Sequence, residues 1–101
     1  MNTFGEYLRM LREKDNLTLR ELSLKLKIDS SLIAKIERNE RSPTKEFIKQ
    51  ISKYFKIDEK KLINEFISDL IAYKILEENV DIGILKVAEK KVNYLKNKTN
   101  G

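Results

Sequence analysis

The sequence predicts an all-α protein, because two features favour helices along the whole chain. Only three glycines and one proline interrupt its 101 residues, so few positions carry a strong helix-breaking signal. Nearly every apolar residue recurs at helical spacing, three or four positions after the last, rather than at every second position as in a strand. A chain of this length buries one modest core with a short appended element.

The first two helices are predicted from matched start signals. Thr3 and Glu6 have the spacing of a capping box at the start of a helix over about residues 3–14. The apolar stripe of this helix is Phe4, Leu8 and Leu11. At the second helix, over about residues 18–26, the Thr18 hydroxyl can cap while Glu21 returns the bond. Its apolar stripe is Leu19, Leu22 and Leu26.

The third and fourth helices have start signals of their own. Asp29 or Ser30 can cap the third helix, which we expect to end near Asn39, a residue that tolerates left-handed backbone. Its inward side chains are Ile33 and Ile36. Residues 42–44, Ser-Pro-Thr, are a further start signal and precede the fourth helix. Its buried stripe is Phe47, Ile48, Ile51 and Phe55.

The second half of the chain predicts two further helices, of which the first is longer than the others. From Glu59 the apolar pattern continues for more than four turns, with more apolar surface than one small core can cover. Residues 79–83 break this pattern, and a last helix follows over about residues 84–96. Its face has a heptad-like spacing that covers barely two repeats. The residues of that face are Leu85, Ala88, Val92 and Leu95.

Composition excludes most small enzymes. The chain has no histidine and no cysteine, so imidazole and thiolate metal sites, thiol nucleophiles and histidine-based catalysis are ruled out. There is no glycine-rich phosphate loop, and the carboxylates fall mostly on outward helix faces. We expect no catalytic residue, no metal and no cofactor. The N-terminal segment lacks the apolar run of a signal peptide or membrane span, which predicts a cytoplasmic protein with no membrane partner.

The positive charge is concentrated in the first half of the chain. The formal net charge is +5; residues 1–57 hold 13 Lys and Arg against 8 Asp and Glu, and residues 58–101 hold 8 of each. A basic half joined to a neutral half is typical of a polyanion-binding surface with a separate module attached. A solvated, lysine-rich surface with no ligand remains an alternative explanation.

The segment from Thr18 to Arg38 has the dimensions of a helix-turn-helix, two short helices joined by a three-residue turn. The sequence of residues 18–43, TLRELSLKLKIDSSLIAKIERNERSP, resembles the signature of lambda repressor/Cro-like (XRE-family) regulators. The resemblance extends from Phe4 to Leu62. It implies a five-helix lambda-repressor-like domain that binds DNA, here with an extended fifth helix and a sixth C-terminal helix.

This resemblance suggests a domain organisation and a function. We expect a helix-turn-helix DNA-binding domain over residues 1–57, a C-terminal helical extension over residues 58–98 and a frayed tail over residues 99–101. The implied function is a sequence-specific regulator of transcription, a repressor or autoregulator that reads a pseudo-palindromic operator in double-stranded DNA as a homodimer.

Three positions depart from the pattern of the family. The family usually has Gln where Leu19 stands, so one polar DNA contact is lost. It usually has Gly at the positions of Lys27 and Asn39, where left-handed backbone is favoured. A lysine in that conformation costs about 1 kcal/mol, and asparagine adopts it more readily.

The docking mode of the family implies which residues contact DNA. The third helix enters the major groove, where side chains near its N-terminus meet base edges. The implied base-reading residues are Ser30, Ser31, Leu32 and Lys35. The implied phosphate-binding residues are Thr18, Arg20, Arg38, Asn39, Arg41 and Lys45. Helix capping is an alternative role for Ser30, and any of the phosphate-binding side chains could instead be merely solvated.

The resemblance also implies an ion pair between Arg12 and Glu37, which would hold the first helix against the end of the third. Such a pair is structural rather than catalytic. Two independent surface charges are the alternative.

The surplus apolar residues of the last two helices predict a dimerisation module. The candidate interface residues are Phe66, Leu70, Ile71, Tyr73, Ile75, Leu85, Val92 and Leu95. The alternative is that these helices fold back to complete the core of the monomer. Two related functions stay open: an antitoxin-type regulator whose C-terminal helices hold a protein partner, and a restriction-modification controller. RNA binding is less favoured, because the phenylalanines all fit core stripes.

Overall fold

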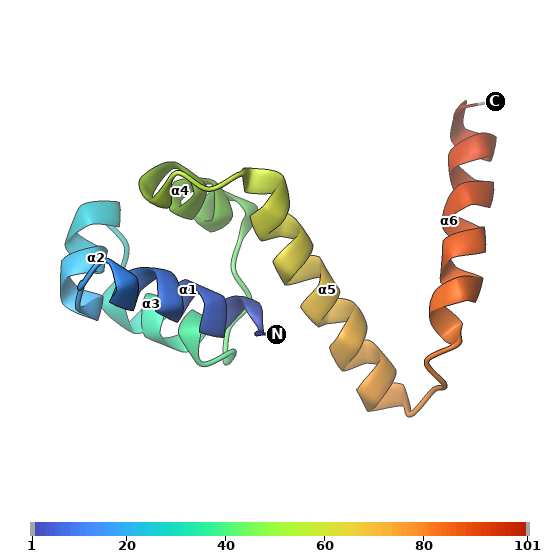
Figure 1. Cartoon of the computed structure of the whole chain (residues 1–101), viewed down its shortest axis with the longest axis horizontal. Helices are drawn as coiled ribbons and strands as arrows, with labels where there is room; N and C mark the ends of the chain where they lie inside the picture. Colours follow the sequence, from blue (N-terminus) through green and yellow to red (C-terminus); the bar gives the residue numbers. More distant parts are fainter. Residues whose placement is uncertain (1, 101) are drawn as a thin grey trace. The chain divides into compact units, whose positions relative to one another are not determined.

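The computed structural model describes residues 2–100, which form six α-helices and no strand, and it confirms the all-α fold class (Figure 1). The helices are α1 (Phe4–Lys14), α2 (Leu19–Leu26), α3 (Ser30–Glu37), α4 (Lys45–Phe55), α5 (Glu59–Glu78) and α6 (Ile84–Asn100). The chain divides into two compact units, the first ending at Leu70 and the second beginning at Ile71. None of the helices within residues 2–100 combines the length and the hydropathy needed to cross a lipid bilayer.

The predicted helix caps are present. Thr3 and Thr18 each form a complete capping box, with Glu6 at α1 and Glu21 at α2. At α3 the cap is Asp29 and not Ser30, because the Asp29 carboxylate accepts a 3.0 Å hydrogen bond from an amide of the first turn. These side chains satisfy amides that have no acceptor inside the helix.

The first five helices are each followed by a residue in the left-handed conformation, and none of these residues is glycine. The φ angle is 57° at Asn16, 58° at Lys27, 62° at Asn39, 56° at Lys56 and 52° at Asn79. Left-handed backbone at Lys27 and Asn39 was expected. Asparagine adopts this conformation readily because its side chain can bond locally, whereas the two lysines have no such compensation.

One helix-to-helix connection is used twice. The sequence Ser-x-x-x-Lys-Ile-Asp occurs at residues 23–29, between α2 and α3, and at residues 52–58, between α4 and α5. In each copy the serine hydroxyl donates to the isoleucine carbonyl. The isoleucine amide donates to the serine carbonyl, at 3.1 and 3.0 Å. The aspartate then accepts from an amide of the next helix. The repeated residues therefore form the same turn in both places.

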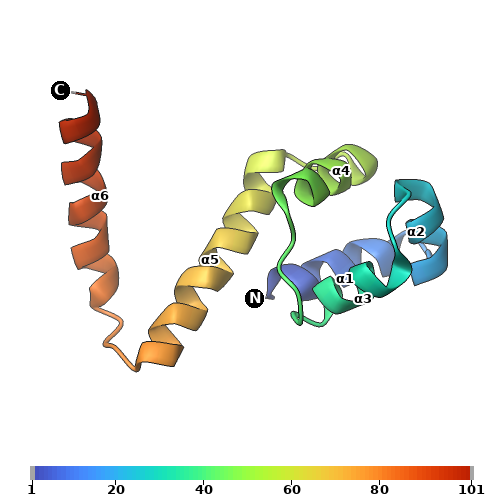
Figure 2. The same ribbon diagram turned by 180° about the vertical axis from the view of Figure 1, so that it is seen from behind.

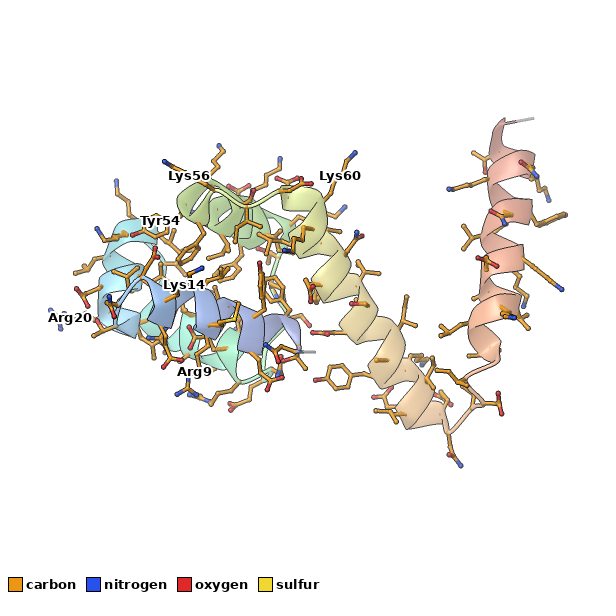
Figure 3. The ribbon with its side chains drawn as sticks, in the orientation of Figure 1. Arg9, Lys14, Arg20, Tyr54, Lys56 and Lys60 are labelled. Atoms are coloured by element: carbon orange, nitrogen blue, oxygen red, sulfur yellow. The ribbon has the colours of Figure 1, made fainter. Side chains whose placement is uncertain are left out.

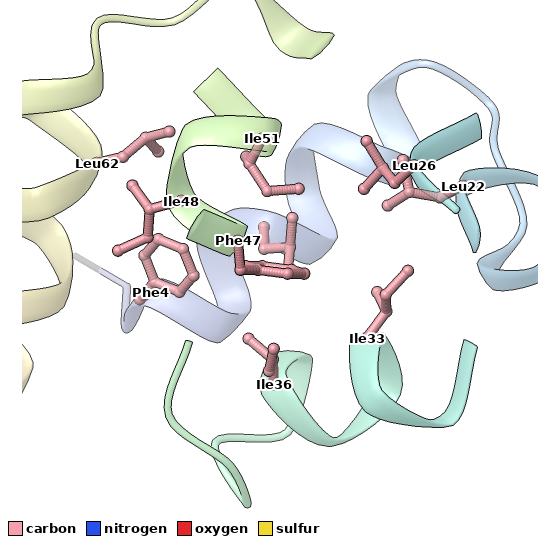
Figure 4. Packing of buried hydrophobic residues seen from close by; sticks show 10 residues of the cluster. Phe4, Leu22, Leu26, Ile33, Ile36, Phe47, Ile48, Ile51 and Leu62 are labelled. Atoms are coloured by element: carbon pink, nitrogen blue, oxygen red, sulfur yellow. The ribbon is translucent and has the colours of Figure 1, made fainter. Parts of the chain in front are cut away.

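A single core lies among α1, α2, α3, α4 and the start of α5 (Figure 4). Its buried side chains are Phe4, Leu8, Leu22, Leu26, Ile33, Ile36, Phe47, Ile48, Ile51 and Leu62. Within the first unit, α4 and α3 lie on opposite sides in both ribbon views (Figures 1 and 2), and Figure 4 shows the core side chains between them. The core thus fixes α3 with one face buried and the other outward.

The second unit differs from the first because it has no buried side chain among residues 71–99. Only Ile75 is half-buried. The last helix continues to Asn100, so the predicted end near residue 96 is wrong by about one turn. No glycine or proline occurs within residues 84–100, and the hydroxyl of Thr99 donates to the carbonyl of Leu95 at 2.7 Å. Of the tail expected to fray, Gly101 lies outside the described residues.

Candidate nucleic-acid interface

The connection between α2 and α3 is a three-residue turn, Lys27 to Asp29, as the helix-turn-helix spacing predicts. Lys27 turns the chain through left-handed backbone, with φ 58° and ψ 44°. Where the two helices cross, Leu22 and Ile33 are completely buried, with 0% of each exposed. The position of α3 relative to α2 is therefore set by packing and by the repeated turn.

The predicted base-reading residues lie near the start of α3. Ser31 and Lys35 are exposed, and Ser30 is half-exposed. Because Asp29 caps the helix, the hydroxyl of Ser30 is not needed as the cap. Leu32, also implied to read bases, is half-buried and packs against the core cluster. The polar outward surface of α3 is thus formed by its serines and Lys35.

The predicted phosphate-binding residues fall into two groups. Arg20, Arg41 and Lys45 are exposed and have no ion-pair partner within residues 2–100. Figure 3 shows Arg20 reaching outward from the start of α2. The other three have partners in the protein: Thr18 caps α2, Arg38 pairs with Glu40 at 2.6 Å, and the side-chain amide of Asn39 donates to the Thr3 hydroxyl at 3.0 Å.

Arg12 and Glu37 are brought together in a buried pair. Arg12 Nε lies 2.7 Å from Glu37 Oε2, and Nη2 lies 2.9 Å from Oε1. Arg12 also donates to the carbonyl of Leu17 at 2.8 Å. The side chains are only 11% and 5% exposed, and the hydrogen bonds to Glu37 raise the pKa of Arg12. This bidentate geometry ties α1 to the last turn of α3.

Sequence reasoning missed the close approach of α1 to α3 at Gly5. A Cβ atom at Gly5 would meet the carbonyl oxygens of Ile36 and Glu37, the latter at 2.6 Å. Gly5 is buried within α1 and has an ordinary helical φ. The signal was present, since a glycine inside a helix is unfavourable unless another backbone needs the space.

The predicted interface residues of the last two helices divide between the units. Phe66 is half-buried and packs against the core of the first unit. Six of the others are exposed, at 44% for Leu70, the last residue of the first unit, and in the second unit at 46% for Ile71, 42% for Leu85 and 50% for Val92, with Tyr73 and Leu95. The remaining one, Ile75, is half-buried.

The second unit contains an open groove of about 320 Å³. Its apolar lining residues are Ile71, Ile75, Val80, Ile84, Leu85 and Ala88. The groove includes three of the predicted interface residues.

Comparisons with known proteins identify a family and a similar fold. A family model described as a helix-turn-helix domain matches residues 5–65, more than half of the chain. No curated protein sequence matches the chain. Among solved structures, a chain of the SinR protein/SinI protein complex is similar over 98% of this chain and 100% of its own length, with a TM-score of 0.57 and 19% identity. At this identity the likeness concerns the fold.

The family match covers α2, the turn and α3 with their caps, together with most of the core, and it extends into α5. The left-handed Lys27, the crossing of α2 and α3, and the Arg12–Glu37 pair all lie inside the matched residues. The chain belongs to the helix-turn-helix family and is a DNA-binding transcriptional regulator of the lambda repressor/Cro-like type.

Proposed function

We propose that the chain is a sequence-specific repressor that binds an operator upstream of its own gene as a homodimer. The observation that carries this proposal is the exposed polar surface of α3, where Ser31 and Lys35 stand outward from a helix fixed by the core. Lysine can donate to the N7 and O6 acceptors of guanine, and a serine hydroxyl can donate or accept. Ser30 and Leu32 flank Ser31, and their exposed parts would contact neighbouring base edges.

The phosphate contacts would come from side chains around α3. Arg20, Arg41 and Lys45 are exposed and have no protein partner in the described chain, so they can neutralise phosphates directly. Thr18, Arg38 and Asn39 would have to share or exchange their present partners. Such contacts orient the protein on the duplex and make binding depend on salt, without reading sequence.

The homodimer would form through the second unit. Most of the large apolar side chains that the described chain exposes lie after Leu70. An exposed apolar surface of this extent is typical of a protein-binding site. Charge does not oppose self-association strongly, because residues 58–101 hold equal numbers of basic and acidic side chains. Two copies would place two α3 helices on two half-sites.

A second candidate is a regulator whose C-terminal helices hold a different protein, as an antitoxin-type protein does. The similar solved chain comes from a complex that contains two named proteins, and the likeness extends over the full chain. The apolar groove of the second unit could receive such a partner as well as a second copy. A purified chain that stays monomeric at every concentration would favour this candidate over the homodimer.

The test is a titration against the duplex immediately upstream of the gene, at two salt concentrations, with random duplex as competitor. The informative variant is the double substitution Ser31→Ala/Lys35→Ala. Lys53→Ala is the matched control, because Lys53 is an exposed lysine on α4, across the core from α3. Tight, salt-sensitive binding that only the double substitution abolishes is the expected result. Equally weak binding to the upstream and random duplexes would contradict the proposal and favour the second candidate.

A further inference from the structure

The N-terminus of α1 is bonded by a side chain 65 positions away in the sequence. The amide of Phe4 donates a 2.7 Å hydrogen bond to Oδ2 of Asp69 on α5. The rings of Phe4 and Phe66 meet edge to face, with centroids 6.2 Å apart. Phe4 is buried and Asp69 is half-buried. One directed hydrogen bond and one ring contact therefore hold α5 against the start of α1.

The chemistry of this bond suits a carboxylate. Phe4 is the first residue of α1, so its amide has no acceptor inside the helix. The Thr3 hydroxyl accepts from Glu6 instead, which leaves the Phe4 amide to Asp69. A negative charge is also favoured at the positive end of the helix dipole. Because hydrogen bonds weaken steeply when bent, this contact restrains α5 more sharply than the ring contact, which tolerates sliding.

The same end of α1 contacts the end of α3. The side-chain amide of Asn39 donates to the Thr3 hydroxyl, and Gly5 lies against the backbone carbonyls of the last turn of α3. The residues from Thr3 to Gly5 thus touch both α3 and α5. Any restraint on α5 at Asp69 is consequently a restraint relative to the helix proposed to read DNA.

We propose that Asp69 is a positioning residue that fixes the direction of α5 relative to α3, and so selects the separation of the two half-sites. Leu62 is the one fully buried residue of α5, and Asp69 follows it by about two turns. Without Asp69 the helix would be held mainly at its first turns and could tilt about them. The half-site separation accepted by a dimer follows from this geometry. This inference rests on the proposed reading of an operator by a dimer.

The experiment selects binding sites from a library of random-sequence duplexes, using the full-length chain and three variants. Asp69→Ala removes the acceptor, and Asp69→Asn keeps an oxygen that can accept from Phe4. Ser68→Ala is the matched control, because the Ser68 hydroxyl bonds only to the Glu65 carbonyl within α5. Affinity for a duplex with one half-site is measured in parallel, which reports whether the α1–α4 core of each variant is folded.

The expected result is a sharp preference for one half-site separation in the wild type and in Ser68→Ala. A change of two base pairs should weaken their binding about tenfold or more, because it rotates one half-site around the helix. Asp69→Ala should select the same half-site sequence at several separations, with unchanged affinity for a single half-site, and Asp69→Asn should restore the sharp preference. An equally sharp profile for Asp69→Ala would overturn the role of Asp69. A wild type that selects only single half-sites would instead overturn the dimeric reading itself.

Discussion

The pair formed by Arg12 and Glu37 shows how a charged contact can hold α3 without touching DNA. Both carboxylate oxygens of Glu37 accept from Arg12, and the third contact of Arg12 goes to a backbone carbonyl. A pair this well buried loses most of its solvation, so its value lies in geometry more than in net attraction. Removing one partner leaves the other charge buried and uncompensated.

Glu37→Ala should therefore lower the free energy of unfolding by about 3–5 kcal/mol, because Arg12 would be stranded. Replacing both residues by apolar ones, in Arg12→Met/Glu37→Leu, should cost much less. Urea unfolding followed by circular dichroism measures both effects. Glu40→Ala is the control, since its pair with Arg38 is about half-exposed and should contribute little. An equal effect of the single and double substitutions would show that stranded charge is not the cause.

Because of the two capping glutamates, the stability of the protein depends on pH in the acid range. Hydrogen bonds from the backbone and hydroxyl of Thr18 lower the pKa of Glu21 below its ordinary value of 4.5. Bonds from Thr3 likewise lower the pKa of Glu6. A group whose pKa is lowered on folding stabilises the protein above its unfolded pKa, and this contribution is lost as the pH falls through the folded pKa.

Glu21→Gln should accordingly flatten the fall in melting temperature between about pH 5 and pH 3, because one ionised cap is removed. At neutral pH the variant should melt slightly below the wild type. Thermal melts across this pH range provide the measurement. Glu46→Gln, an exposed first-turn glutamate with no capping bond in the described residues, serves as the control. A variant whose melting temperature falls as steeply as that of the wild type would argue against this linkage.

At the scale of the elements, the repeated Ser-x-x-x-Lys-Ile-Asp connection places a lysine in left-handed backbone twice. Glycine has no Cβ to strain there, so Lys27→Gly and Lys56→Gly should each stabilise the protein by up to about 1 kcal/mol. For a domain of this size that corresponds to a rise of about 4–8 °C in melting temperature. Lys53→Gly, inside α4, should have the opposite effect.

The elements also show what the sequence could predict. Thr3 and Thr18 were recognised as caps because a capping box is a local pattern, and the left-handed Lys27 followed from the turn position. The bond from Phe4 to Asp69 could not be predicted, since residues 65 apart leave no trace in helical periodicity. The close approach of α3 at Gly5 does not follow from periodicity, because periodicity records where apolar side chains recur and glycine has no side chain. Leu32 lies outside the stripe of Ile33 and Ile36, yet it packs against the core, because the neighbours of α3 cover a wider face than that stripe.

At the scale of the whole molecule, the two units differ in how much apolar surface they bury. The first buries ten large apolar side chains in one cluster, whereas none of residues 71–99 is fully buried. A 17-residue helix such as α6 is marginally stable in water unless its apolar face is covered. The stability of the second unit should therefore depend on association, while that of the first should not.

Val92→Glu tests this dependence, because Val92 lies in the middle of the apolar face of α6 and is 50% exposed. A buried, unpaired carboxylate would oppose association, so sedimentation should show a lower mass than for the wild type at the same concentration. Unfolding of the first unit should be unchanged, since Val92 is outside its core. Affinity for a two-half-site operator should fall about 100-fold or more as the benefit of bivalent binding is lost. Tyr94 is exposed on another side of α6, so Tyr94→Glu should leave the mass and the affinity unaltered. Equal effects of the two substitutions would show that the face containing Val92 is not the interface.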